Sequence, residues 1–306
     1  MSSIHQRLKP KTKDLGDDFV VRRTLPQRKQ QMVGPFIFWD HMGPTELFGE
    51  KELKVRAHPH IGLATITYLF HGEIMHRDSL GNTQAIRPGE VNWMTAGKGI
   101  VHSERSQALD QPMQLEGIQL WLALPKGQED RDPGFYHSKE SELPQFEQGG
   151  IQFRLIAGEF LGHNSSVPTY SPLFYLNAKS SEGGVFSHQL NADHDAAIYV
   201  IEGQVDVETE TLERFDMLTF KPGSHWTINA KPGAEFMIFG GQMFSEPRYL
   251  WWNLVSSSKD KVEAAKKDWA SGRFDKVVDE DEWIPLPTEE SVTYVVAASA
   301  GLDLKN

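Results

Sequence analysis

Two pairs of potential metal ligands share one spacing in the sequence. The first pair is His58 and His60, and the second is His102 and Glu104, with one residue between the members of each pair. In an extended chain, residues i and i+2 point to the same side, so each pair can direct both side chains at one point. Two such strands lying side by side would bring together three nitrogens and one carboxylate oxygen. This donor set suits Fe(II), Mn(II), Ni(II), Cu(II) or Zn(II).

Either pair alone would be explained as two unrelated surface residues. The repetition of the spacing, and the glycine-rich segment 95–99 ahead of His102, favour a metal site instead. Glycines permit a sharp bend that can deliver the following strand into the mouth of a barrel.

The absence of cysteine further limits which metal ligands and catalytic groups the chain can offer. The chain of 306 residues has twelve histidines and no cysteine. This excludes disulfide scaffolds, thiolate zinc sites, iron–sulfur clusters and a cysteine nucleophile. Any bound metal must therefore be held by His, Asp or Glu.

The charge balance bears on partners and location. The 31 basic and 42 acidic residues give a net charge of −11, which disfavours direct binding to nucleic acid or to an anionic membrane. Residues 1–31 are locally basic, with eight Lys or Arg against three Asp, and are expected to form a solvated arm. No apolar segment approaches the ~18–20 residues needed to span a bilayer, and no signal-peptide pattern is present, so a cytoplasmic protein is expected.

Short strands, separated by Gly and Pro, dominate the pattern along the chain. β-Branched and aromatic runs predict strands at 64–70, 119–124, 152–157, 173–178, 197–201, 217–220 and 235–239. One helix is predicted near 258–271, with N-capping serines before it, apolar residues at i, i+3 and i+7, and Gly272 after it. The polar stretch 125–150 is expected to be a linker or a pair of long loops.

The two halves of the chain resemble each other. Residues 68–74 align with 199–205 at an offset of 131, each as a strand, a turn glycine and a second strand. The predicted fold class is therefore all-β, with two β-barrels, the first over residues 1–136 and the second over 145–306. The same offset places Gln189 and Asn191 where His58 and His60 stand in the first half. Because amides are poor metal ligands, the second barrel is expected to be metal-free and to buttress the first.

Several motifs resemble those of the pirin family within the cupin superfamily. The matching segments are 33–41 (VGPFIFWDH), 58–62 (HPHIG), 93–104 (WMTAGKGIVHSE), 118–122 (IQLWL) and 271–274 (SGRF). The resemblance runs from about residue 19 to 275. It implies a bicupin, that is, two jelly-roll-type barrels, whose first barrel holds one metal, expected to be Fe(II), through His58, His60, His102 and Glu104. Ni, Mn, Co, Cu and Zn stay open as alternatives. One departure is that residues 61–67 lack the Glu that many cupins carry after the first motif.

The resemblance also implies an activity, namely ring opening of flavonol-like aromatic substrates by O₂ in the manner of quercetin 2,3-dioxygenases. Glu104 would then act as the catalytic base. His41 and Trp93 are candidates for lining the metal pocket or orienting a ligand. His71 and His76, at a hairpin, are expected at the surface.

Two other functions are compatible with the same site. One is a non-enzymatic, iron-dependent and redox-sensing regulator that binds a protein partner, of the transcription-cofactor type. The other is a different cupin reaction on a small molecule, such as an isomerisation. All three candidate functions would use the same metal site, and nothing in the sequence identifies a substrate.

Overall fold

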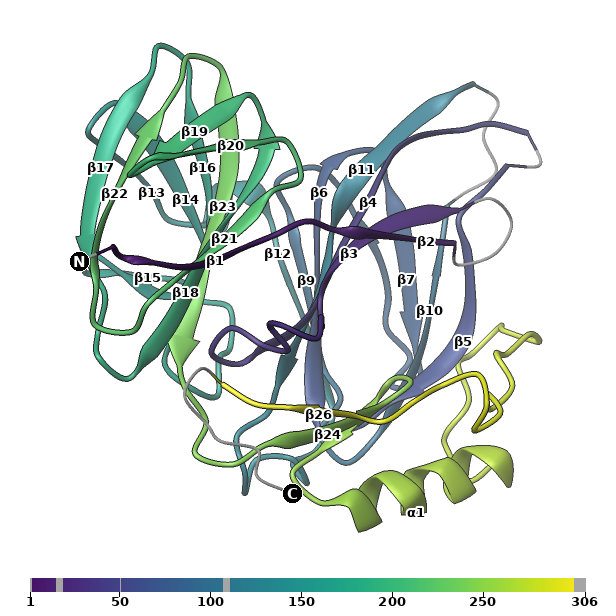
Figure 1. The fold of residues 1–306 in the computed structure, drawn as a ribbon. Helices are drawn as coiled ribbons and strands as arrows, with labels where there is room; N and C mark the ends of the chain where they lie inside the picture. The colour runs from purple at the N-terminus through teal and green to yellow at the C-terminus, as the bar shows by residue number, and fades with distance from the viewer. Residues whose placement is uncertain (1, 15–18, 50, 107–110, 300–306) are drawn as a thin grey trace.

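The computed structural model describes residues 2–14, 19–49, 51–106 and 111–299, and shows two β-barrels side by side (Figure 1). Each barrel combines one large and one four-stranded antiparallel sheet. This is the predicted all-β bicupin architecture. Among the described residues, no helix is both long and apolar enough to cross a membrane.

The N-terminal barrel carries the two histidine motifs in its smaller sheet. That sheet runs in the order β5 (Lys54–His60), β10 (Ile100–Arg105), β7 (Ile74–Asp78), β8 (Thr83–Ile86). The larger sheet runs in the order β12 (Gly134–Ser138), β9 (Val91–Thr95), β6 (Leu63–His71), β11 (Met113–Ala123), β4 (Phe36–Leu47), β3 (Val20–Leu25), β2 (Lys11–Asp14).

The C-terminal barrel repeats this plan. Its smaller sheet runs in the order β17 (Gly184–Gln189), β22 (His225–Ala230), β19 (Gln204–Val207), β20 (Glu210–Glu213). Its larger sheet runs in the order β1 (Ile4–Leu8), β21 (Met217–Phe220), β18 (His194–Glu202), β23 (Ala234–Gln242), β16 (Leu173–Ser180), β14 (Ile151–Phe160), β13 (Gln145–Gln148), and β15 (His163–Asn164) pairs with β14. The equivalent strand orders agree with the internal repeat seen in the sequence.

Segments near both ends of the chain pack against the opposite barrel. The expected domain division at residues 1–136 and 145–306 did not anticipate this exchange. β1 pairs with β21, so the first strand belongs to the C-terminal barrel. Its Leu8 is buried, and Arg7 and Lys9 form ion pairs with the buried Asp216. The expectation of a solvated N-terminal arm is therefore wrong for β1, because this strand has a sheet edge to complete. Residues 1 and 300–306, the outer limits of the expected domains, lie outside the described residues.

At the other end, the chain returns to the N-terminal barrel. A three-stranded sheet of β25 (Leu254–Ser256), β24 (Arg248–Trp251) and β26 (Val295–Ala297) lies below that barrel, followed outward by α1 (Lys259–Ala270) (Figure 1). The predicted helix is confirmed. The expected linker at 125–150 is wrong in part, since it contains β12, the short 3₁₀ helix Glu140–Glu142 and β13.

An aromatic core joins the two barrels. Trp39 and Trp93 of the first barrel share one buried cluster with Tyr199 and Phe239 of the second. The rings of Trp39 and Phe239 stack with centroids 4.3 Å apart. Large aromatic surfaces buried in this way supply much of the free energy of a domain interface.

Candidate metal centre

The antiparallel pairing of β5 with β10 brings three histidines to one point. His102 stands directly opposite His58, and Ile100 stands opposite His60. All three histidines are buried, and one ring nitrogen of each lies within 4.8 Å of the others. Within the described part of the chain, this is the one group of three or more His, Asp or Glu side chains with the spacing of a metal site.

Hydrogen bonds fix which nitrogen of two of these rings faces the centre. Nδ1 of His58 donates to the carbonyl oxygen of Arg56 at 2.8 Å, and Nδ1 of His60 donates to that of Asn253 at 3.1 Å. Each ring therefore keeps its Nε2 lone pair free, the usual arrangement for a metal-binding histidine.

The donor set fits a transition-metal cation. Nε2 of His60 lies 3.1 Å from Nε2 of His102. Two nitrogens bound at right angles to a metal, each at about 2.1 Å, would be about 3 Å apart. At this distance the two lone pairs would repel each other, so either a metal cation or the Nε2 proton of one ring must lie between them.

Burial also keeps these ligands neutral. Removal from water lowers the pKa of His58 to about 4 and lowers the pKa of His60 and His102 well below the ordinary value. For His60 and His102, repulsion from neighbouring histidines adds to this effect. Neutral imidazole is the form that binds metal, so the site needs no deprotonation step near neutral pH.

Glu104 lies on the same strand but is not one of the three clustered side chains. A bulge between His102 and Glu104 places Glu104 opposite Val55. The side chain is buried, and its Oε1 lies 3.2 Å from the Thr67 hydroxyl, whose single proton can go either to Glu104 or to Oε1 of Gln119 at 2.7 Å. Burial raises the pKa of Glu104, against the smaller lowering effects of His76 and Thr67. Glu104 is thus positioned beside the histidines and within reach of the Thr67 hydroxyl, and its role as a fourth ligand stays a prediction.

The structure does not place His41 and Trp93 at the metal site. His41 donates from Nε2 to Glu116 at 2.9 Å and accepts at Nδ1 from the hydroxyl of Tyr199 at 3.2 Å. Trp93 lies in the inter-barrel core and donates to Thr95 at 2.9 Å. Both face the second barrel. The prediction failed because side chains alternate across a strand, and the sequence did not show which face of the strand meets the metal site.

Two residues beside the cluster were missed by the sequence reasoning. His76, expected at the surface, is buried against His102, with its Nδ1 3.4 Å from Nδ1 of that ring. The side chain of Asp78 lies 3.0 Å from Nε2 of His76. The signal that could have found them is the spacing itself, since His76 and Asp78 form a third i, i+2 pair of potential ligands. His71 is exposed, as expected.

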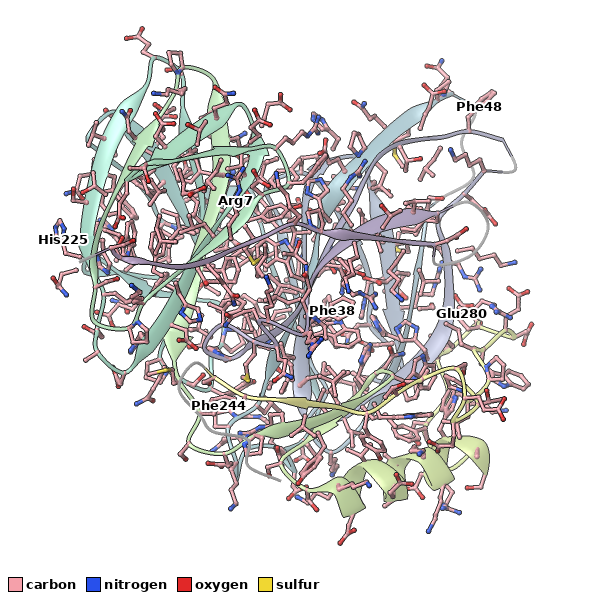
Figure 2. The ribbon with its side chains drawn as sticks, in the orientation of Figure 1. Arg7, Phe38, Phe48, His225, Phe244 and Glu280 are labelled. Atoms are coloured by element: carbon pink, nitrogen blue, oxygen red, sulfur yellow. The ribbon has the colours of Figure 1, made fainter. Side chains whose placement is uncertain are left out.

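An aromatic wall adjoins the cluster on the larger sheet. The ring of Trp121 lies 5.2 Å from that of His60 and stacks on Phe38 at 3.8 Å (Figure 2 labels Phe38). The guanidinium of Arg23 lies over the ring of Phe38, 4.3 Å from the ring centroid. Phe38 and Trp121 are both buried and belong to one core cluster of the first barrel.

The returning C-terminal segment supports the strands that carry the ligands. Asn253 contributes the carbonyl that orients His60. Glu280, labelled in Figure 2, accepts hydrogen bonds of 2.8 Å from the hydroxyl of Ser103 and from Nε of Arg105. Val277 packs against Val101 on the outer face of β10. The outer face of the sheet that carries the histidine cluster is therefore covered by residues far away in the sequence.

The second barrel has different side chains at the equivalent positions. His188 stands opposite Trp226 in the β17–β22 pair, just as His58 stands opposite His102. The sequence offset of 131 was therefore one residue too large, and Gln189 is exposed. Trp226 at the position equivalent to His102 removes a potential ligand and fills the space with an indole ring.

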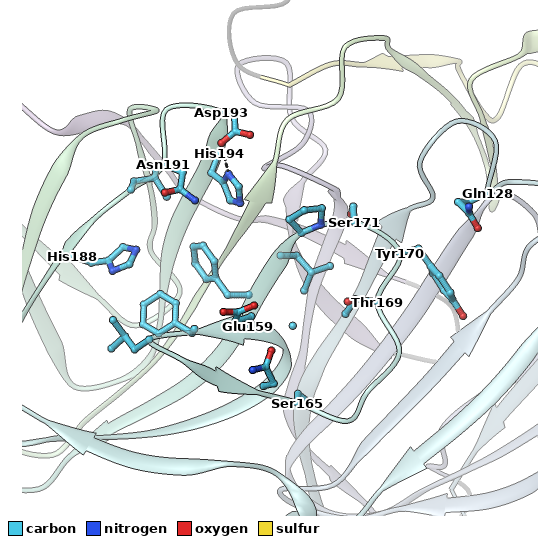
Figure 3. A pocket seen from close by; sticks show the side chains of 18 residues that line it. Gln128, Glu159, Ser165, Thr169, Tyr170, Ser171, His188, Asn191, Asp193 and His194 are labelled. Atoms are coloured by element: carbon cyan, nitrogen blue, oxygen red, sulfur yellow. Dashed lines mark hydrogen bonds and ion pairs between the residues drawn. The ribbon is translucent and has the colours of Figure 1, made fainter.

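The mouth of this barrel opens onto a pocket of about 940 Å³ (Figure 3). His188 lies at one end, near Phe160 and Phe174, and the hydrogen-bonded pair Asp193 and His194 lies at the rim. His225, at the outer surface in Figure 2, does not line it. The three nearby histidines thus do not converge as those of the first barrel do.

Two cupin-type barrels, of which the first contains a buried three-histidine cluster, define a bicupin with one candidate metal centre. Residues 18–122 match the Pirin family model, and residues 175–275 match the model of the Pirin C-terminal cupin domain. The chain belongs to the pirin family.

Individual relatives agree with this assignment. A pirin-like protein of Caulobacter vibrioides is 48% identical over 90% of this chain and 96% of its own. A Pseudomonas aeruginosa protein, whose name gives quercetin 2,3-dioxygenase as a candidate activity, is 36% identical over 87% of this chain and 84% of its own. The crystal structure of a quercetin 2,3-dioxygenase from Acinetobacter baumannii superposes with a TM-score of 0.86 at 33% identity, covering 92% of this chain and 95% of that one.

Proposed function

We propose that this protein is a mononuclear metal-dependent dioxygenase of the quercetin 2,3-dioxygenase type, acting on flavonol-like aromatic substrates. The observation that carries the proposal is the buried cluster of His58, His60 and His102, whose neutral rings converge beside Glu104. The Pseudomonas aeruginosa and Acinetobacter baumannii relatives support it through the activity in their names. Fe(II) is the proposed metal because the pirin resemblance implies it, and the nitrogen and oxygen ligands are compatible with it as well as with the other metals named above.

The residues around the cluster suit this chemistry. A bound metal would act as a Lewis acid and lower the pKa of a coordinated substrate hydroxyl. Glu104 would accept that proton at a carboxylate oxygen, and its Oε1 lies 3.2 Å from the Thr67 hydroxyl. The buried rings of Trp121 and Phe38 beside His60 would help to keep water from the site.

The test is an activity measurement with defined metals. The protein is stripped with a chelator, loaded without oxygen with Fe(II), Mn(II), Co(II), Ni(II), Cu(II) or Zn(II), and mixed with quercetin and air. Loss of the flavonol absorption band is the expected result with at least one metal. His60→Ala should abolish it, whereas His71→Ala, at an exposed position, should not. If no metal supports turnover, the dioxygenase proposal fails.

One contact favours a second candidate, a metal-dependent regulator that binds a protein partner. Ser103, between His102 and Glu104, is hydrogen-bonded to Glu280 of the outer C-terminal segment. A change at the metal could therefore reach the surface through one side chain. A protein that binds metal tightly, consumes no flavonol, and captures a partner only when metal-loaded would support this candidate over the enzyme.

A further inference from the structure

Beside the candidate ligands, β7 supplies a histidine with no role in the proposed reaction. β7 pairs with β10 on the side opposite β5, so that Glu104 stands opposite His76 and His102 opposite Asp78. His76 is buried, and its ring stacks on Phe135 with centroids 4.6 Å apart and planes inclined by 19°. The position of this ring is thus fixed by packing, not by a metal ligand.

Asp78 determines which nitrogen of His76 carries the proton. Its Oδ1 accepts from the backbone N–H of Leu80 at 2.9 Å and of Asn82 at 3.1 Å. Its Oδ2 lies 3.0 Å from Nε2 of His76 and 3.0 Å from Nδ2 of Asn82. A carboxylate surrounded by donors can only accept, so His76 must donate from Nε2 and keep a lone pair on Nδ1.

That lone pair in turn orients His102. Nδ1 of His76 lies 3.4 Å from Nδ1 of His102. When His76 accepts there, His102 carries its proton on Nδ1 and presents a free Nε2 to the cluster, 3.1 Å from Nε2 of His60. His58 and His60 obtain the same tautomer from backbone carbonyls. For His102, the corresponding partner in the structure is the His76 ring.

We propose that Asp78 and His76 form a hydrogen-bonded relay that holds His102 in the tautomer whose Nε2 binds the metal. Both are positioning residues, since neither would touch the metal or substrate. The proposal rests on the proposed metal-binding function. It goes beyond that function by assigning a role to two residues on a strand that carries no ligand.

Two substitutions separate the relay from simple packing. His76→Phe keeps a ring to stack on Phe135 and removes the acceptor. Asp78→Asn should reverse the direction in which His76 donates its hydrogen bond, for a geometric reason. The new side-chain oxygen must stay at the Oδ1 position to accept from Leu80 and Asn82, which places the NH₂ group against Nε2 of His76. His76 would then accept at Nε2 and donate from Nδ1 towards His102.

The first readout needs no metal. Long-range ¹H–¹⁵N NMR spectra of the metal-free protein report the tautomer of each histidine. The relay predicts His102 protonated at Nδ1 in the wild type, whereas the competing contact with His60 at 3.1 Å would place the proton on Nε2. His76→Phe should give mixed tautomers, and Asp78→Asn should move the proton to Nε2. His76→Asn, which restores an acceptor near the Nδ1 position, should return His102 to the wild-type tautomer.

The second readout is the affinity for Co(II), measured in competition with a chromophoric chelator. His76→Phe and Asp78→Asn should raise the Kd by about 10- to 100-fold, the range known for residues that orient metal ligands. His71→Phe, the same substitution at an exposed site on the adjoining β6, should leave it unchanged.

The outcomes distinguish the two proposals. A wild-type protein that does not bind Co(II) contradicts the proposed function, while the NMR comparison still decides the relay. The relay is overturned if the wild type binds Co(II) and both His76→Phe and Asp78→Asn behave like it. That means that both variants keep the wild-type affinity and keep His102 protonated at Nδ1. Should His76→Phe fail to fold, Asp78→Asn and His76→Asn give the same decision.

Discussion

At the scale of single residues, hydrogen-bond partners separate histidines of the same type into different roles. His58 and His60 donate from Nδ1 to backbone carbonyls and keep Nε2 free for a metal. His41 is just as buried, but it uses one nitrogen for Glu116 and the other for Tyr199. Both nitrogens of His41 are therefore engaged, and it serves the barrel interface.

The role of Glu104 can be tested by Glu104→Gln. The amide keeps the shape and an oxygen towards Thr67 but cannot take up a proton, so metal binding should be partly retained. The kcat for flavonol should fall by about 10²- to 10⁴-fold, the usual contribution of a general base. Turnover and metal content are measured on the same preparation. Full turnover by Glu104→Gln would contradict the role of Glu104 as a base.

At the scale of elements, the central position of β10 explains why the site forms there. β10 lies between β5 and β7, so His102 meets two ligands on one side and the ring of His76 on the other. The turns that end these strands must be tight. Gly62 has a φ of +66°, and Gly97 has a φ of +52°, conformations that favour glycine.

We expect Gly62→Ala to destabilise the end of β5, the strand that carries His58 and His60. A Cβ at Gly62 would lie 1.9 Å from the carbonyl oxygen of Val255, and the positive φ adds strain. Together these should lower the free energy of unfolding by at least about 2–3 kcal/mol. The matched control is Gly81→Ala, with a φ of +87° but nothing within 4 Å of the added Cβ.

Urea unfolding of the two alanine variants measures this difference. The Gly81 variant should lose only about 1–2 kcal/mol, the cost of the left-handed conformation alone. Because β5 ends just before Gly62, the Gly62 variant should also bind metal more weakly. Equal stability losses in the two variants would show that the contact with Val255 does not restrict the turn.

At the scale of the whole molecule, the chain ends and a buried polar network hold the two barrels together. β1 completes the second barrel, and the C-terminal segment covers the first. Between them, Glu116 of the first barrel accepts from His41 at 2.9 Å and from Arg214 of the second barrel at 2.6 Å. His41 also accepts from Tyr199 of the second barrel.

This network predicts a pH-dependent contribution to stability. Burial raises the pKa of Glu116, but the hydrogen bonds and charges of His41 and Arg214 outweigh it and lower the pKa below the ordinary 4.5. A lowered folded-state pKa means that the ionised form stabilises the fold. The contribution is complete above about pH 5 and is lost as the pH falls through the folded-state pKa.

Glu116→Gln should therefore lower the free energy of unfolding at pH 7 by about 1.5–3 kcal/mol, the range for hydrogen bonds to charged groups. Denaturant unfolding at pH 7, 5 and 3 tests this. The gap between wild type and variant should persist at pH 5 and shrink towards pH 3. A gap independent of pH would mean that packing, and not the charge, makes the contribution.

Sequence reasoning succeeded where the pattern is local. The i, i+2 spacing of His58 and His60 predicted two rings on one side of a strand, because side-chain alternation depends only on the extended backbone, and the structure brings His102 of the second pair to the same point. The strands, the C-terminal helix and the repeat followed from local periodicity. His41 and Trp93 were misplaced because alternation does not reveal which face of a strand meets the metal.

The sequence by itself determined which kinds of ligand this protein can offer to a metal. Without cysteine, and with two paired motifs, it could only offer nitrogen and oxygen ligands, and it specified two β-barrels of one design. The tertiary structure alone decided what surrounds those ligands. His76, Asn253 and Glu280 reach the metal-bearing sheet through strand pairing and chain return, and contacts between residues distant in sequence arise from the folding of the whole chain.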